Sequence, residues 1–306
     1  MNLKAAAIDI GTNSCRLLIG ESRQNNAQEN REIVIKERKL KITRLGEGVD
    51  KNKMLNQKAV ERVYSALKEY KEIIDQHNLD KIRLVGTSAL RDVNNSELLK
   101  DRIKDLGINL EIISGRKEAE LNYLGAADNL DDDFLLIDIG GGSTEFVWPN
   151  DEICFKSLDI GCVRMTERFI EDPSQALKSE EIEKISTYVS NLISSELNFH
   201  KELEVKGVGG TITTLAALKF EMEDYDSKKI EGSSLSIDGL DSTLESFQKL
   251  KLEERSKLKG LQPKRADIIS AGLIILLEIL KYISCESLTV SDQDLLYGLL
   301  KEELLA

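Results

Sequence analysis

Histidine and cysteine are both scarce in this chain of 306 residues. The two histidines, His77 and His200, lie in segments with polar neighbours, so we expect surface side chains rather than ligands. Catalysis built on histidine and zinc bound by histidine are therefore disfavoured. The four cysteines are scattered without metal-ligand spacing, which predicts reduced thiols in a cytoplasmic protein: Cys15, Cys154, Cys162 and Cys285.

The chain also lacks an excess of positive charge. Its formal net charge is −12, whereas surfaces that bind nucleic acid or acidic membranes are basic. Neither nucleic acid nor an acidic membrane is therefore expected as a partner. A polyanionic substrate is still compatible with the net charge if basic residues gather in one groove. A hydrophobic fraction of 41% beside 31% charged residues favours a soluble globular enzyme.

Long apolar runs are missing as well. The longest, residues 268–283, is interrupted by Glu278 and Lys281, so it predicts a buried helix rather than a membrane span. Asp9 interrupts the apolar start of the chain, so no signal peptide is expected.

The most informative stretch is a glycine turn between two apolar segments. Residues 135–137 predict a buried strand, and Asp138 stands where that strand should end. Residues 140–142 are all glycine, which allows backbone angles closed to other residues. Amides of such a turn can converge on an anion, while Asp138 and Glu145 can hold a divalent cation beside it. The pattern predicts a metal-bound phosphate, and the alternative is a tight hairpin whose glycines only meet turn geometry.

The start of the chain repeats this pattern. Residues 8–14 (IDIGTNS) align with residues 137–143 (IDIGGGS), with the Asp, the Ile-Gly pair and the Ser at one fixed offset. The repeat predicts a duplicated domain whose two turns face each other across a cleft. Two carboxylates brought together repel unless a cation lies between them, which favours Mg²⁺.

Hydrophobic periodicity elsewhere predicts alternating strands and helices, with an acidic loop at residues 131–133. Ser96 is expected to cap a helix that ends near Gly107. A Gly-Gly-Thr turn at 209–211 that feeds a helix N-terminus is an anion site. The alternation predicts a mixed sheet with helices on its faces. Strands are expected at 33–42, 82–85, 110–113 and 288–291, a strand, loop and helix at 205–218, and helices at 56–75, 114 onward, 179–198, 240–255, 266–281 and 294–305.

Taken together, six segments resemble the exopolyphosphatase / guanosine pentaphosphate phosphohydrolase (Ppx/GppA) family. They occur in the family's order, from Asp9 nearly to the C-terminus: residues 9–16, 86–91, 113–119, 138–145, 207–211 and 265–267. The resemblance implies an α/β fold of two ribonuclease-H-like domains, the actin–Hsp70–sugar-kinase fold, with an interdomain cleft. It implies a short two-domain form, with residues 1–125 and the C-terminal helix 295–306 in the first domain and residues 126–294 in the second.

The resemblance also implies roles for particular residues. Glu118 aligns with the family's catalytic glutamate, which activates the attacking water as a general base. Asp138 and Glu145 align with acidic residues near the metal and the nucleophile, and Asp9 faces them as a third metal ligand. Phosphate contacts are expected from the turns and from two arginines: Thr12, Asn13, Ser14, Arg16, Arg91, Gly140, Gly141, Gly142, Ser143, Thr144, Gly209, Gly210 and Thr211.

Some of these residues also have ordinary structural interpretations. Glu118 could be a first-turn helix carboxylate that the helix dipole favours. Arg91 could form a surface ion pair, and Arg16 could pair with a nearby carboxylate instead of a phosphate. Residues 264–265, like residues 116–117, are expected to be solvated basic pairs, and the alternative is that they line a path for polyphosphate.

The chain departs from the family pattern at three positions. Lys117 stands where the family often has a second glutamate before Ala119. Near the C-terminus, Asp294 and Leu296 stand where the family pattern has glycine and arginine. The changes at positions 294 and 296 put into question one substrate contact that the family pattern has near the last helix.

The resulting hypothesis is a cytoplasmic, Mg²⁺-dependent phosphohydrolase. It would remove the terminal phosphate from inorganic polyphosphate or the 5′-γ-phosphate from guanosine pentaphosphate. The resemblance implies a homodimer, Mn²⁺ as the alternative metal and K⁺ as a stimulating ion. The rival hypotheses are a kinase of the same superfamily and a non-catalytic protein that binds polyphosphate or an alarmone.

Overall fold

The computed structural model describes residues 2–25, 30–127, 133–149, 153–198 and 203–305. Contacts divide the chain into two compact units, which are Met1–Ala127 with Gln293–Ala306 (unit 1) and Asp128–Asp292 (unit 2). Two features singled out in the sequence, residues 131–132 of the acidic loop and His200, lie outside the described residues.

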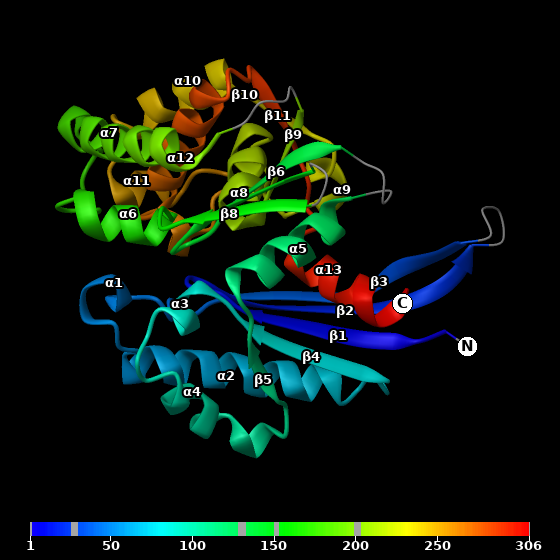
Figure 1. The fold of residues 1–306 in the computed structure, drawn as a ribbon. Coiled ribbons are helices and arrows are strands. Elements are labelled where there is room, and N and C mark those ends of the chain that lie inside the picture. Colours follow the sequence, from blue (N-terminus) through cyan, green and yellow to red (C-terminus); the bar gives the residue numbers. More distant parts are fainter. Residues whose placement is uncertain (1, 26–29, 128–132, 150–152, 199–202, 306) are drawn as a thin grey trace. The chain divides into compact units, whose positions relative to one another are not determined.

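Unit 1 is built on a five-stranded sheet with the order β3-β2-β1-β4-β5 (Figure 1). Strand β2 is antiparallel to both of its neighbours, β3 and β1, whereas β1, β4 and β5 are parallel. Its strands are β1 (Lys4–Ile10), β2 (Ser14–Asn25), β3 (Asn30–Ile42), β4 (Lys81–Gly86) and β5 (Leu110–Ile112). Its helices are α1 (Val49–Asn52), α2 (Gln57–Ile74), α3 (Ser88–Arg91), α4 (Glu97–Arg102), the 3-10 turn η1 (Lys104–Leu106), α5 (Gly115–Ala126) and α13 (Leu295–Leu304).

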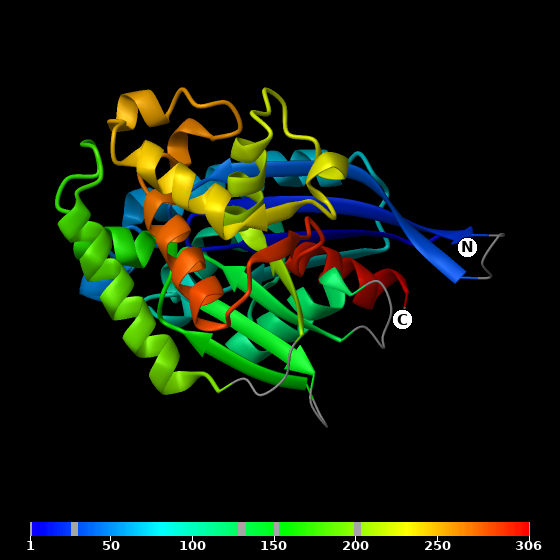
Figure 2. The same ribbon diagram turned by 90° about the horizontal axis from the view of Figure 1, so that it is seen from above.

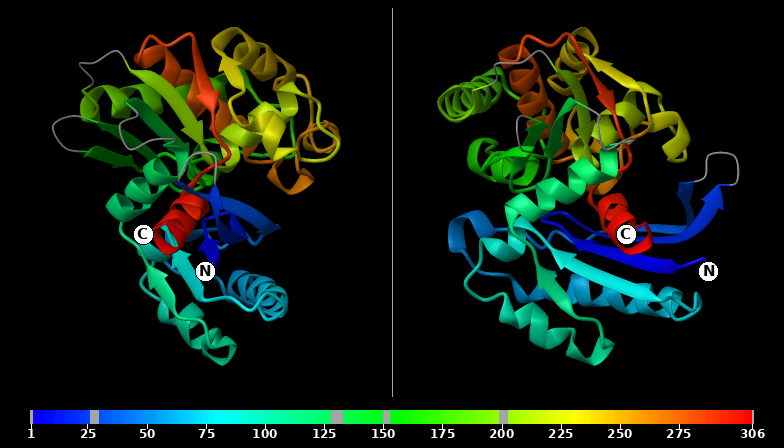
Figure 3. Two further views of the ribbon diagram at one scale, coloured as in Figure 1. Left: turned by 90° about the vertical axis from the view of Figure 1, so that its right-hand side faces the viewer. Right: turned by 45° about the vertical axis from the view of Figure 1, so that its right-hand side comes forward.

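Alternation along β1 explains why helices cover both faces of this sheet. Successive side chains of a strand point to opposite faces. Ile8 and Ile10 pack in one apolar cluster with residues of α2. Ala5 and Ala7 pack in another with residues of α13. The views from further sides place α13 beside α5 on this second face (Figure 3).

The sheet of unit 2 has the strand order β10-β11-β9-β6-β7-β8. Read from β8, the strands β8-β7-β6-β9-β11 correspond to β3-β2-β1-β4-β5 of unit 1, and β10 is the additional strand. Its strands are β6 (Phe134–Ile139), β7 (Thr144–Pro149), β8 (Ile153–Leu158), β9 (Glu204–Val208), β10 (Ser234–Ser236) and β11 (Ser287–Val290). Its helices are α6 (Cys162–Phe169), α7 (Ser179–Glu196), α8 (Gly209–Lys219), α9 (Ser227–Ile230), α10 (Ile237–Phe247), α11 (Leu252–Arg255), the 3-10 turn η2 (Pro263–Arg265) and α12 (Ile269–Tyr282).

The core of unit 2 forms around α12, which lies beside α7 (Figure 2). The apolar run predicted to be a buried helix is α12, and this prediction is confirmed because nearly all of its residues are buried. Among the described residues, no helix is both long and apolar enough to cross a membrane. Each of the four cysteines is a free thiol.

Three details of the sequence-based prediction are wrong. Residues 205–218 contain no loop, because β9 ends at Val208 and α8 begins at Gly209. Residues 240–255 form two helices, because Glu254 Oε2 accepts the Lys251 N–H at 2.8 Å and starts a new helix there. Ser96 makes no capping bond, since its backbone is already in the helical region and its hydroxyl is not placed to accept one.

Candidate active site

The first turn of unit 1, residues 11–13, is held by a neighbouring loop through its carbonyl groups. Gly11 N–H donates to Ser14 O at 2.9 Å. The carbonyl of Thr12 accepts from Gly46 at 2.8 Å, and that of Asn13 accepts from Thr43 and Arg44 at 3.0 and 2.9 Å. The N–H and C=O of one trans peptide unit point in opposite directions. The amides of Asn13 and Ser14 therefore face away from the loop.

The glycine turn of unit 2 has the same arrangement with a different support. Gly140 N–H donates to Ser143 O at 3.0 Å. The carbonyl of Gly140 accepts from Cys162 at 3.0 Å, and that of Gly141 accepts from Val163 at 2.9 Å. Cys162 and Val163, which donate to these two carbonyls, belong to the first turn of α6. By the same planarity argument, the amides of residues 141–143 face away from α6.

Arg164 is a part of this site that the sequence reasoning missed. Its side chain is 9% exposed, and its Nε donates to the carbonyl of Gly142 at 2.7 Å. It completes the set of donors on the turn carbonyls. No motif points to Arg164, although its place in the first turn of α6, the first helix after the hairpin, would have been a signal once the hairpin was known.

Asp138 and Glu145 are directly opposite each other on β6 and β7. Cross-strand partners present their side chains on the same face of a sheet. Ser157, the β8 partner of Glu145, donates its hydroxyl to Glu145 Oε1 at 2.8 Å. The two carboxylates thus share one face of the sheet, and the cation site that the glycine turn and its two carboxylates predict there stays a prediction.

Gly209 is required by its closeness to Asp138. A Cβ at this position would lie 2.0 Å from Asp138 Oδ1, and the φ of Gly209 is +85°. Because β6 and β9 are parallel, their carboxyl ends meet at one edge of the sheet. The glycine turn and the N-terminus of α8 at Gly209 therefore lie at the same edge.

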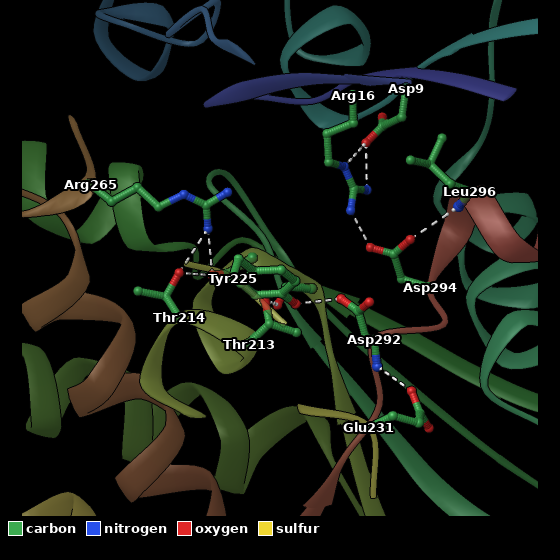
Figure 4. A network of polar contacts seen from close by, with 12 residues as sticks. Asp9, Arg16, Thr213, Thr214, Tyr225, Glu231, Arg265, Asp292, Asp294 and Leu296 are labelled. Atoms are coloured by element: carbon green, nitrogen blue, oxygen red, sulfur yellow. Dashed lines mark hydrogen bonds and ion pairs between the residues drawn. The ribbon is translucent and has the colours of Figure 1, made fainter. Parts of the chain in front are cut away.

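Arg265 is not the solvated residue that the sequence suggested. It is 7% exposed, and its Nη1 donates to Gly210 O and, at 3.1 Å, to Thr214 Oγ1 (Figure 4). The guanidinium lies against the first turn of α8, where a Cβ on Gly210 would lie 2.3 Å from Nη1. The prediction failed because a basic pair in a polar loop carries no local sign of burial.

In unit 1, the residue opposite the aspartate is an arginine. Asp9 and Arg16 are cross-strand partners, and Asp9 Oδ2 accepts from Nε and Nη2 of Arg16 at 3.0 and 2.6 Å. The Nη1 of Arg16 donates to Asp294, the N-cap of α13 (Figure 4). Burial alone would lower the pKa of Arg16, but Asp294 and Asp9 raise it well above its usual value. Arg16 thus pairs with carboxylates, which is the structural interpretation left open by the sequence.

Arg91 and Glu118 form another ion pair of unit 1. Arg91 Nη1 lies 2.5 Å from Glu118 Oε2 and donates to Ile113 O at 3.2 Å. Glu118 is in the first turn of α5, whose N-cap Ser114 accepts the Lys117 N–H at 3.2 Å. The Glu118 residue is only 8% exposed, so it is not an ordinary solvated helix-start carboxylate.

The strand order of unit 1 explains why these groups share one region. Since β1, β4 and β5 are parallel, the segments after them start at one sheet edge. Those segments are the turn at 11–13, α3 with Arg91, and α5 with Glu118. The predicted site residues of this unit therefore come together at that edge.

The predicted site residues divide between the units. Unit 1 holds Asp9, Thr12, Asn13, Ser14, Arg16, Arg91 and Glu118, and unit 2 holds the others. Within the described residues of either unit, no group of three or more His, Cys, Asp or Glu side chains is arranged as a metal site. Two carboxylates with phosphate oxygens and water suit Mg²⁺, which needs few protein ligands. The convergence of Asp9, Asp138 and Glu145 on one metal stays a prediction.

The departures from the family pattern have local explanations. The ammonium of Lys117 pairs with Glu302 of α13. Leu296 is buried in the apolar cluster between α13 and the sheet. Asp294 caps α13 by accepting the Leu296 N–H at 3.2 Å while it holds Arg16.

Comparison with known proteins identifies the family. A model of the Ppx/GppA phosphatase family matches residues 7–306. The chain is 35% identical over 317 residues to exopolyphosphatase 2 of Mycobacterium tuberculosis, covering 97% of both chains. It is 40% identical to the bifunctional 3-dehydroquinate synthase/phosphatase of Fusobacterium nucleatum, covering 98% of this chain. The chain spans about half of that relative, 46% of its length.

Solved structures agree with this match. A Ppx/GppA family member from Aquifex aeolicus is 32% identical and has a TM-score of 0.81, with 100% of this chain and 98% of that chain covered. An exopolyphosphatase from Cytophaga hutchinsonii is 26% identical with a TM-score of 0.84, covering 98% and 97%. The predicted α/β fold with two ribonuclease-H-like units is confirmed.

Proposed function

Because this chain belongs to the Ppx/GppA phosphatase family, we propose that it hydrolyses a terminal phosphoanhydride bond. The substrates are inorganic polyphosphate, from which it releases the end phosphate, and guanosine pentaphosphate, from which it releases the 5′-γ-phosphate. The name of the M. tuberculosis relative, exopolyphosphatase 2, supports polyphosphate as the first substrate to test.

The observation that carries the proposal is the way α6 holds the glycine turn of unit 2. Donors from the first turn of α6 bind the carbonyls of Gly140 and Gly141, and Arg164 binds that of Gly142. The amides of residues 141–143 are thereby directed to the other side. Consecutive amides with a common direction form a concavity that binds anions. A phosphate group offers oxygens that accept such bonds.

Glu118 is the proposed general base in unit 1. The ion pair with Arg91 fixes the carboxylate in one orientation, so that it can accept a proton from an attacking water. We assign Arg91 to positioning Glu118, in addition to the phosphate contact predicted from the sequence. Phosphoryl transfer depends mainly on positioning and on neutralising charge, and turn amides with oriented side chains provide both.

We propose Asp138 and Glu145 as metal-facing carboxylates in unit 2 and Asp9 as one in unit 1. Within the described residues, Asp9 Oδ1 is buried and accepts no hydrogen bond, and a buried oxygen of this kind is completed by a cation or its bound water. Mg²⁺, when bound, supplies neutralisation of the charge on the phosphate oxygens.

The test is phosphate release from polyphosphate and from guanosine pentaphosphate by Glu118→Gln. A general base contributes about a hundredfold or more, so we expect a loss of this size in kcat with substrate binding retained. Glu120→Gln on the same helix is the control, because Glu120 pairs with Arg116 at an exposed site. If Glu118→Gln keeps wild-type activity, the assignment of the base is wrong. If the wild-type protein releases phosphate from neither substrate, the proposed function is wrong.

The homodimer also stays a proposal, which light scattering after size-exclusion chromatography tests. A mass of about one chain, against 34.3 kDa calculated from the sequence, would rule it out.

A further inference from the structure

Asp294 occupies a fixed place at the start of α13 in unit 1. Its backbone lies against α5, where a Cβ on Gly125 would meet Asp294 O at 2.3 Å. One turn further along α13, a Cβ on Gly298 would meet Leu121 O at 1.9 Å. The two contacts fix the helix on α5, and the Asp294 side chain is held at the helix N-terminus through its bond from Leu296.

From this place Asp294 holds the Arg16 guanidinium together with Asp9. The guanidinium gives Nε and Nη2 to Asp9 and Nη1 to Asp294. Arg16 is the third residue of β2, the strand that follows the turn whose outward amides are those of Asn13 and Ser14. An anion that approaches these amides would meet an arginine whose positive charge is matched by two carboxylates, so the trio has a formal net charge of −1.

We propose that Asp294 is a positioning residue that keeps Arg16 on Asp9 and withholds it from the substrate's phosphates. Arg16 then orients the Asp9 carboxylate instead of binding phosphate. The consequence is weaker holding of a phosphate chain and easier release of orthophosphate than a neutral residue at position 294 would give. This inference rests on the proposed function, because it concerns the same phosphate site.

The test variant is Asp294→Asn, which removes the charge and keeps an oxygen that can cap α13. We expect the KM for polyphosphate and the inhibition constant of orthophosphate to fall by roughly tenfold, the scale of one hydrogen bond to a charged group. We expect kcat to fall as well, because Asp9 loses its fixed partner. Asp294→Ser, which also caps helices, is the second neutral variant if the first does not fold.

The matched control is Glu303→Gln. Glu303 lies at the other end of α13 and pairs with Arg83 at 3.0 Å, so the same class of ion pair and the same charge are removed away from the turn. The KM and the orthophosphate inhibition constant should stay at the wild-type values.

A double-mutant cycle distinguishes action through Arg16 from a general structural effect. In an Arg16→Gln background, Asp294→Asn should change neither KM nor orthophosphate affinity any further. Arg16→Met, which also carries no charge, is the background if Arg16→Gln is too unstable to purify. Unchanged or weaker orthophosphate binding by Asp294→Asn, measured by calorimetry, would overturn the inference while the proposed function stands. A wild-type protein that neither binds orthophosphate nor hydrolyses the substrates would overturn both.

Discussion

The first hairpins of the two units have one backbone design and different chemistry. In each, an aspartate on the first strand pairs across to the residue seven positions later, and a glycine N–H closes the turn on a serine carbonyl. In unit 1 the partner of Asp9 is Arg16, whereas in unit 2 the partner of Asp138 is Glu145. The duplication thus preserved the position of the carboxylate and changed the charge that faces it.

The supports of the two turns differ in the same way. A loop, residues 43–46, binds the carbonyls of the first turn, and the N-terminus of α6 binds those of the glycine turn. A helix N-terminus carries a partial positive charge, so α6 adds to the electrostatics of the unit 2 turn. The comparison shows that unit 1 pairs its aspartate with an arginine, while unit 2 places two carboxylates on one face beside a turn held by a helix N-terminus.

The largest effect is expected from Gly209→Ala, which acts on the carboxylate of unit 2. The added Cβ would lie 2.0 Å from Asp138 Oδ1, so the carboxylate must move. A shift of about 1 Å in a reacting group can cost about a hundredfold in rate, and phosphate release measures it. Gly232→Ala is the control, because its φ is +72° but no atom lies within 4 Å. Equal activity of the two variants would contradict the prediction.

Arg16→Gln should show how far unit 1 depends on its internal ion pair. Removing one partner of a buried pair costs about 3 kcal/mol, and here two carboxylates, Asp9 and Asp294, lose their partner. The free energy of unfolding from urea titration is the measurement. Arg102→Gln, which breaks a more exposed pair with Glu61, should lower the free energy of unfolding much less, because solvent screens an exposed ion pair. A stability of Arg16→Gln equal to wild type would remove the contrast between the units.

Glu145→Gln sharpens the other half of the comparison. If unit 2 holds the metal, the loss of one carboxylate should raise the Mg²⁺ concentration for half-maximal activity on the order of tenfold. A titration of activity against Mg²⁺ measures this. Glu204→Gln, an exposed change at the start of β9 in the same unit, should leave the titration unchanged. An unaltered Mg²⁺ dependence in Glu145→Gln would place the metal elsewhere.

The smallest effect is expected from an ion pair of unit 1 that lies away from the turn. Burial would raise the pKa of the Glu303 carboxyl, but hydrogen bonds from Arg83 and Lys81 hold this pKa below its usual value of 4.5. A carboxyl whose pKa is lowered by folding stabilises the fold above its unfolded pKa, and this contribution is lost as the pH falls through the folded value. Wild-type protein should therefore lose up to about 1 kcal/mol more than Glu303→Gln between pH 6 and about pH 3. Parallel pH profiles of the two proteins would refute this.

The sequence was sufficient for the parts of the fold that are encoded locally. The amphipathic pattern at 56–75 is α2, and the strand at 82–85 is β4. Both hairpins could be predicted because glycine and other turn-forming residues separate two apolar runs in each case. Residues 240–255 could not be predicted as two helices, since a capping contact made by Glu254 competed with a continuous helical pattern.

The residues of the candidate site also divide into those that the local sequence predicts and those that it does not. The glycine turns and Glu118 follow from motifs of consecutive residues. The pairing of Arg16 with Asp294 does not follow from a motif, because the two residues are 278 positions apart in the chain. The burial of Arg265 depends likewise on a contact with Gly210, which is 55 positions away. Contacts of this kind are set by tertiary packing, and one sequence carries no local sign of them.

The place of α13 has a consequence for biosynthesis. The ribosome delivers β1 well before α13, yet α13 packs on the apolar side chains of Ala5 and Ala7. Unit 2 has been synthesised before that cover arrives. One apolar face of the first sheet therefore lacks the cover of α13 until residues 295–304 have been synthesised, and a nascent chain stalled before residue 295 is the form that chaperones would recognise.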